Sequence, residues 1–167
     1  GRVRRSEADG ERSACSRREE KVQGPLGEYQ RAPAAGDLIA SRIALLKLVG
    51  ADDSNPSYWE QLGRVQVELG SFRDAYYAFS RAHELDRGNV AALSSLTQLA
   101  LMSGDVEAAE DHADKLALLE PEHPAIKLAY ASVALKRSDW DEADRQIDPL
   151  LQASPREPTA NLLKARV

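Results

Sequence analysis

The sequence predicts an all-α protein in which antiparallel helix pairs stack into an α-solenoid. Three observations predict this class: the chain repeats itself with a stride of 34 residues, apolar residues recur at helical spacing, and helix-capping residues stand at equivalent places in successive repeats. Each repeat therefore holds two amphipathic helices, which bury their apolar faces against each other and against the neighbouring repeats.

The overall composition fits a soluble helical protein better than a disordered chain or a membrane protein. Of the 167 residues, 43% are hydrophobic, 29% are charged and only 5% are aromatic. The 27 acidic residues outnumber the 22 Lys and Arg, so the formal charge of -5 would repel a phosphate backbone, and no nucleic-acid partner is expected. Cys15 is the only cysteine, which excludes an internal disulfide and a four-cysteine zinc site.

Residues 1–34 differ from the rest of the sequence, because they carry many charges and no apolar stripe that a helix would bury. Glycine and proline interrupt the chain around the end of this segment, at Gly24, Pro25, Gly27, Pro33 and Gly36. We predict a disordered tail and linker over 1–34 that holds no long helix, followed by the solenoid over 35–167. We also expect the chain to be part of a longer protein, since it begins with Gly1 and ends at Val167 within a predicted helix.

The most apolar run of the chain covers residues 38–49 and is interrupted by Arg42 and Lys47. A helix that crosses a bilayer needs about 20 apolar residues, so this run is interpreted as a packed helix and no membrane span is predicted.

Two columns of helix signals recur along the chain. A glycine or serine that suits a tight turn stands at Gly36, Gly70, Gly104 and Ser138, and each is followed by an N-capping residue, at Asp37, Ser71, Asp105 and Asp139. A second capping column stands at Asn55, Asn89 and His123, and the residues after it are Pro56, Val90 and Pro124. These columns predict the starts of two helices in every repeat.

Apolar residues between the caps follow the spacing of amphipathic helices. They recur at three and four residues in the first helix of one pair, at Trp59, Leu62, Val65 and Leu69, and again in the second, at Ala75, Ala78, Phe79 and Ala82. Ordering one pair costs roughly 50 kcal/mol, which demands about 2,000 Å² of buried apolar area. A single pair cannot bury that much alone, so adjacent pairs must stack.

The residues of this pattern resemble the tetratricopeptide repeat. The run that carries the resemblance is Trp59, Leu62, Gly63, Gly70, Phe72, Ala75, Phe79, Ala82 and Leu85, with closing prolines at Pro121 and Pro155. The resemblance implies a right-handed superhelix with repeats over about 56–89, 90–123 and 124–157, a partial fourth from 158, and an orphan second helix over 36–50. Four positions depart from the family pattern: Gln66, Arg87, Leu93 and Lys127.

The resemblance also implies a binding surface, because members of the family bind a peptide or a partner helix in a concave groove lined by the first helix of each pair. Transferred by register, the groove residues are Glu60, Arg64, Val67 and Glu68 from the first repeat, Ser94, Gln98, Leu101 and Met102 from the second, and Leu128, Ser132, Leu135 and Lys136 from the third. Their mixed, largely apolar character favours a helical or partly apolar ligand. Of these residues, Arg64, Gln98, Met102 and Lys136 are predicted to matter most for affinity.

One subtype of this family is not expected. Repeats that bind the carboxylate terminus of heat-shock chaperones use a cationic clamp, whereas the equivalent positions here are Glu60, Arg64, Ala125 and Ala129.

The sequence contains no recognisable catalytic, cofactor or metal motif, and the three histidines are too few and too scattered to form a ligand cluster. Four neighbouring residues, Glu110, Asp111, His112 and Asp114, are interpreted as a solvated acidic face rather than a metal site. His123 is interpreted as an N-cap. We therefore predict that the chain is not an enzyme and uses no cofactor.

The function predicted from these observations is a non-catalytic scaffold that binds a protein or peptide in its groove. Two alternatives stay open: the repeat portion of a bacterial assembly factor for cytochrome c, pilus or secretion subunits, in the periplasm or anchored to a membrane, and a regulatory repeat domain of a larger enzyme. The composition suits the cytoplasm and the periplasm equally and does not fix an oligomeric state.

Overall fold

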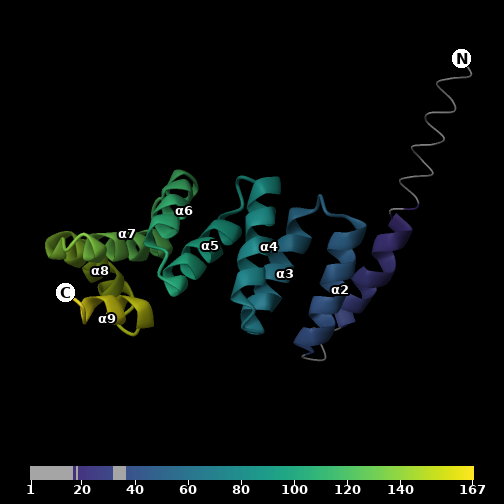
Figure 1. The fold of residues 1–167 in the computed structure, drawn as a ribbon, viewed down its shortest axis with the longest axis horizontal. Coiled ribbons are helices and arrows are strands. Elements are labelled where there is room, and N and C mark those ends of the chain that lie inside the picture. The colour runs from purple at the N-terminus through teal and green to yellow at the C-terminus, as the bar shows by residue number, and fades with distance from the viewer. Residues whose placement is uncertain (1–16, 18, 32–36) are drawn as a thin grey trace, which may run out of the picture. The chain divides into compact units, whose positions relative to one another are not determined.

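The computed structural model describes residue 17, residues 19–31 and residues 37–167, and every regular element within these ranges is helical. The helices are drawn in Figure 1. One helix covers residues 19–31. The others are α2 (Leu38–Ala51), α3 (Pro56–Glu68), α4 (Phe72–Leu85), α5 (Val90–Ser103), α6 (Val106–Leu119), α7 (Pro124–Lys136), α8 (Trp140–Ala153) and α9 (Pro158–Lys164). The predicted all-α class is confirmed.

The helix starts follow the stride of 34 residues. The first helices α3, α5, α7 and α9 begin at residues 56, 90, 124 and 158, and the second helices α2, α4, α6 and α8 begin at residues 38, 72, 106 and 140. Consecutive helices pack as pairs, α3 on α4, α5 on α6 and α7 on α8. The predicted all-α class built from antiparallel helix pairs is therefore confirmed.

The first helices begin at the predicted N-caps. The Asn55 side chain accepts the Ser57 N–H at 3.0 Å, and the Asn89 side chain accepts the Ala92 N–H at 2.8 Å. Nδ1 of His123 accepts a backbone N–H at 3.2 Å, which confirms this histidine as a cap.

The second helices begin after tight turns. All but one of them have the predicted side-chain cap. Asp37, Asp105 and Asp139 each accept a backbone N–H from the first turn of their helix, whereas Ser71 makes no side-chain cap bond, contrary to the prediction. The backbone before three of these caps is left-handed, with φ of 73° at Gly70, 77° at Gly104 and 59° at Ser138. The turn column thus marks positions that favour glycine.

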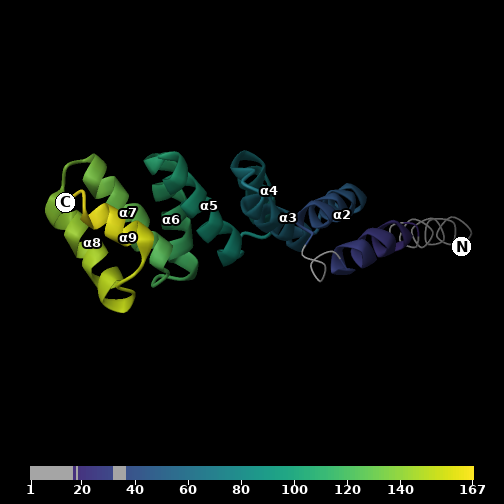
Figure 2. The same ribbon diagram turned by 90° about the horizontal axis from the view of Figure 1, so that it is seen from below.

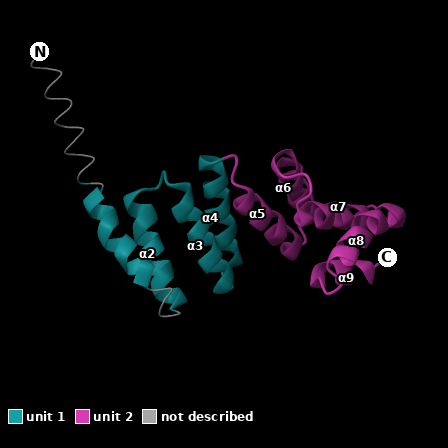
Figure 3. Ribbon diagram, turned by 180° about the vertical axis from the view of Figure 1, so that it is seen from behind, with its two compact units in different colours: residues 1–86 teal, residues 87–167 magenta. Residues whose placement is uncertain are grey.

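The chain divides into two compact units, residues 1–86 and residues 87–167, which are coloured separately in Figure 3. Unit 1 has a core between α2, α3 and α4, formed by Leu45, Leu48, Val49, Leu62, Val65 and Ala78. Unit 2 has two core clusters, one between α5, α6 and α7 and one between α7, α8 and α9.

The helix over residues 19–31 contradicts the predicted linker over this part of 1–34. This helix runs beside α2 (Figure 2). Val22, Leu26 and Tyr29 pack against the unit 1 core, and the Lys47 ammonium lies 2.6 Å from the Glu28 carboxylate. Burial of three apolar side chains outweighs the low helix propensity of Pro25 and its glycine neighbours. As a result α2 is not an orphan second helix. Residues 1–16, 18 and 32–36 lie outside the described residues, so the predicted tail there is not tested.

Candidate functional site

Unit 1 contains a pocket of about 620 Å³ between the helix over residues 19–31, α2 and α3. One face of α3 supplies six of the ten described residues that line it, because residues spaced by three and four lie on the same side of a helix. These α3 residues are Ser57, Glu60, Gln61, Arg64, Val65 and Glu68. The rest of the lining comes from the preceding helix pair: Tyr29, Asp37, Leu38 and Ser41.

The polar groups of the pocket are partly joined to one another. The Arg64 guanidinium lies 2.6 Å from the Glu60 carboxylate, one turn earlier on the same helix. Nε2 of Gln61 donates to the Ser57 hydroxyl at 3.0 Å. On α2 the buried Ser41 hydroxyl donates to the Asp37 carbonyl at 2.9 Å. These bonds hold the side chains of the lining in place.

Tyr29 brings an aromatic ring to this pocket from the helix over residues 19–31. Burial raises the pKa of the Tyr29 hydroxyl, the positive charge of Arg64 opposes that rise, and the negative charge of Glu68 adds to it. The Tyr29 hydroxyl therefore interacts electrostatically with Arg64 and Glu68 of α3.

Three of the four groove residues predicted for the first repeat lie together in this pocket. Glu60, Arg64 and Glu68 belong to the lining, whereas Val67 lies outside it. Sequence reasoning missed Tyr29, Asp37, Leu38 and Ser41, because it placed no first helix before α2. The spacing of Val22, Leu26 and Tyr29 by four and three residues is the signal that would have shown this helix.

The groove residues predicted on α5 in unit 2 differ in their exposure. Gln98 is exposed and Met102 is 64% exposed, so both are accessible to a ligand. The Ser94 hydroxyl donates to the Ala91 carbonyl at 3.1 Å, and Leu101 packs against both core clusters. Of the four predicted groove residues on α5, Gln98 and Met102 therefore offer open contact area.

On α7 the prediction that Leu128 is displayed in a groove is wrong. Leu128 is only 6% exposed, because α9 covers it and contributes Ala160 and Leu163 to the same cluster. Leu135 also packs against this cluster, and the Ser132 hydroxyl donates to the Leu128 carbonyl at 2.9 Å.

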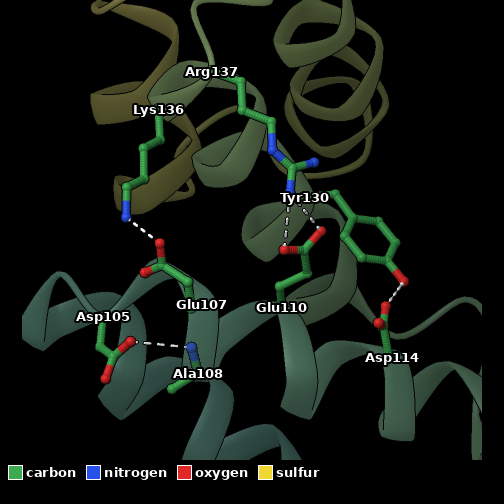
Figure 4. A network of polar contacts seen from close by, with 8 residues as sticks. All are labelled: Asp105, Glu107, Ala108, Glu110, Asp114, Tyr130, Lys136 and Arg137. Carbon is green, nitrogen blue, oxygen red and sulfur yellow. Dashed lines mark hydrogen bonds and ion pairs between the residues drawn. The ribbon is translucent and has the colours of Figure 1, made fainter.

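Lys136, the last groove residue predicted on α7, forms an ion pair with a residue of α6. Its ammonium donates to the Glu107 carboxylate, and this hydrogen bond is the main reason why the pKa of Glu107 is lowered (Figure 4). The neighbouring Arg137 lies 3.3 Å from Glu110. Lys136 therefore joins α7 to α6, and a ligand would compete with Glu107 for it.

Acidic residues of the predicted acidic face on α6 form ion pairs and hydrogen bonds with neighbouring side chains. Asp114 accepts the Tyr130 hydroxyl at 2.7 Å, and Asp111 lies 2.5 Å from the Lys115 ammonium. Burial and the Asp114 bond raise the pKa of Tyr130 to about 12. Within the ranges that the structure describes, no group of three or more His, Cys, Asp or Glu side chains is arranged to hold a metal ion. In the same ranges, no helix combines the length and apolar character of a membrane span.

Several solved structures of tetratricopeptide repeat proteins are similar to this chain. A repeat protein from Parabacteroides merdae superposes with a TM-score of 0.70 at 18% identity, over 88% of this chain and 59% of that one. MamA from Desulfovibrio magneticus RS-1 gives a TM-score of 0.72 at 13% identity, over 87% and 85% of the two chains. YrrB, described as having an unusual peptide-binding site, gives 0.72 at 16% identity, over 88% and 76%.

These likenesses show the fold. The chain spans less than two thirds of the Parabacteroides protein. An O-GlcNAc transferase from Thermobaculum terrenum also matches, with a TM-score of 0.56 at 23% identity, over 71% of this chain but only 23% of the enzyme. No protein-family model matches the sequence, and the search of curated proteins finds no match.

Proposed function

We propose that this chain, which has the tetratricopeptide repeat fold, is a non-catalytic scaffold that binds a peptide or a helix of a partner protein on the surface of its first helices. The observation that carries the proposal is the unit 1 pocket, in which Glu60, Arg64 and Glu68 of α3 lie together. Its volume of about 620 Å³ falls within the range of about 300 to 1,000 Å³ that is typical of ligand pockets. The peptide-binding site of YrrB, a structural neighbour, also supports it.

In unit 2 the same proposal is supported by two exposed side chains of α5. Exposed Gln98 and Met102 stand four residues apart, which places them on one side of the helix. A flexible, exposed methionine suits contact with an apolar side chain of a partner, and the neighbouring amide supplies a donor and an acceptor.

The proposal is tested by a pull-down from the source cell with a variant in which Arg64, Gln98 and Met102 are all changed to alanine. Lys136 is left intact, because its loss would also remove the contact with Glu107. The matched control changes three exposed residues of second helices to alanine: Arg73, Leu118 and Gln152. The proposal predicts that partners are lost from the first variant and kept by the second, while both keep the helicity of the parent. Identical partners for the first variant and the parent would contradict it.

A regulatory repeat region of a larger enzyme is the second candidate, and the likeness to part of the O-GlcNAc transferase favours it. The reading frame on both sides of these 167 residues discriminates between the two candidates. A catalytic motif in the same frame would favour the enzyme appendage, and further repeats alone would favour the scaffold.

A further inference from the structure

The unit 1 pocket carries more negative than positive charge. Carboxylates line it at Asp37, Glu60 and Glu68, and Arg64 is the one cationic residue among the described residues that line it. Three formal negative charges against one positive charge leave an excess of two negative charges. A cationic group is therefore attracted to the pocket, and an anionic group is repelled.

The single positive charge is already compensated. The Arg64 guanidinium lies 2.6 Å from Glu60, so this pair contributes little net charge. The Asp37 carboxylate accepts the Ala40 N–H at 2.9 Å as the cap of α2. Among the described residues, no cation forms an ion pair with Asp37 or Glu68. These two carboxylates, one at the start of α2 and one at the end of α3, hold the excess negative charge.

The rest of the lining is partly apolar. Leu38 and Val65 contribute aliphatic surface, and Tyr29 contributes an aromatic ring that is partly buried. The side chains of Lys and Arg combine an aliphatic stem with a charged end, and they cover apolar surface with the stem while the charge meets an acid. A cation close to an aromatic face gains a further attraction.

We propose that this pocket binds the side chain of a Lys or Arg residue in a partner segment. The charged end lies toward Asp37 and Glu68, and the stem lies against Leu38, Val65 and the Tyr29 ring. The pocket volume of about 620 Å³ also leaves room for the backbone on either side of that residue. This inference rests on the proposed function and adds that the partner segment carries a basic side chain.

The helix over residues 19–31 forms part of the proposed site. It supplies Tyr29, and it is held against unit 1 by Val22 and Leu26 and by the ion pair between Glu28 and Lys47. A chain that lacks this helix loses one wall of the pocket while α2 and α3 keep the carboxylates.

The experiment is a selection of random heptapeptides displayed on phage against the full chain of 167 residues. Affinities of the selected peptides are then measured for the variant that combines Asp37→Asn with Glu68→Gln. Asparagine caps a helix as well as aspartate does, so this variant removes charge without removing the cap of α2. The control is Glu84→Gln, which removes one charge from α4 outside the pocket. Tyr29→Ala and Tyr29→Phe test the aromatic wall.

The inference predicts that selected peptides are enriched several-fold in Lys or Arg at one position. Exposed charge pairs each contribute modestly to affinity, so we expect the double variant to bind these peptides about five- to tenfold more weakly. Tyr29→Ala weakens binding several-fold, whereas Tyr29→Phe and Glu84→Gln retain it. High salt weakens binding to the parent more than to the double variant, because salt screens exposed charges.

Selected peptides without a basic preference, or with equal affinity for parent and double variant, would overturn the inference. If such peptides still lose affinity for the variant at Arg64, Gln98 and Met102, the proposed function stands and only the basic specificity is wrong. If they bind that variant as they bind the parent, or if no peptide is selected, the proposed function fails as well.

Discussion

Gly63 on α3 packs directly on the ring of Phe79 on α4. A Cβ atom built at Gly63 would lie 2.9 Å from Cε1 and from Cζ of that ring, closer than carbon atoms approach in folded proteins. Phe79 is only 1% exposed, and the buried small residues Ala75, Ala78 and Ala82 stand on the same helix. This contact sets how closely the two helices of the pair approach.

Gly63→Ala tests the contact. Alanine favours a helix over glycine by about 1 kcal/mol, but overpacking a core costs about 1 to 3 kcal/mol. Because the buried Phe79 ring has little room to move, we expect the free energy of unfolding to fall by about 1 to 2 kcal/mol. Chemical denaturation measures the change.

Gly50→Ala is the matched control. Gly50 also lies in a helix, near the end of α2, but no atom lies within 4 Å of its added Cβ. Here the gain in helix propensity of up to about 1 kcal/mol remains. Equal effects of the two substitutions on the free energy of unfolding would show that the contact between Gly63 and Phe79 does not limit how closely α3 and α4 approach.

Ser138→Gly is expected to stabilise unit 2. Ser138 holds φ at 59°, in the left-handed region where the equivalent Gly104 has φ of 77°. A side chain in this region costs about 1 to 2 kcal/mol, and the greater freedom of glycine in the unfolded chain offsets part of that gain. We expect the free energy of unfolding to increase by about 0.5 to 1 kcal/mol, as measured by thermal denaturation. Ser154→Gly, at φ of -142°, provides the contrast, and it is expected to destabilise.

Asp114→Asn is expected to lower the pKa of Tyr130 from about 12, but not to the ordinary value of 10. Burial is the largest cause of the rise and persists in the variant, while the negative charge of Asp114, which strengthens its hydrogen bond with Tyr130, is lost. Because the pKa is raised in the folded state, the contribution of Tyr130 to stability is present below pH 10 and is lost between pH 10 and about 12. Carbon NMR of labelled tyrosine measures the titration.

Asp111→Asn serves as the control for this titration, since Asp111 pairs with Lys115 on the same helix. A Tyr130 pKa that is unchanged by Asp114→Asn would refute the assigned cause.

Lys136→Gln is expected to raise the pKa of Glu107 toward its ordinary value of 4.5. The hydrogen bond from Lys136 is the largest cause of the lowered pKa, and a backbone hydrogen bond keeps part of the shift. Since the pKa is lowered in the folded state, the contact stabilises the fold above pH 4.5 and is lost as the pH falls through the lowered value. A titration of the Glu107 carboxyl carbon by NMR checks this, with Lys115→Gln as a variant that should leave it unchanged.

The repeats were predictable because their signals are local. A cap such as Asn89 and a turn residue such as Gly104 act on neighbouring backbone, so a comparison of columns at a stride of 34 residues locates the helix starts. The helix over residues 19–31 was not predicted, because Pro25 and its glycine neighbours oppose it locally. Its support comes from Leu26 and Tyr29 packing on a core formed later in the chain.

The site was predictable in part for the same reason. Register along α3 places Glu60 and Arg64 on one face, and the structure brings both into a pocket. Register does not show which partners lie opposite. Lys136 is held by Glu107, 29 residues earlier in the sequence, and Leu128 is covered by α9. Both outcomes depend on packing between helices, and the spacing of residues along one helix carries no information about that packing.

The first helices are proposed to form the partner-binding surface of this chain. A titration of the nitrogen-labelled protein with a selected peptide, followed by the shifts of backbone amides in the NMR spectrum, locates that surface. We expect the largest shifts on α3 around Glu60 to Glu68, on α2 near Asp37, on residues next to Tyr29 and, for ligands of unit 2, on α5 near Met102. Shifts confined to the exposed faces of α4, α6 and α8, with none on α3 or α5, would contradict it.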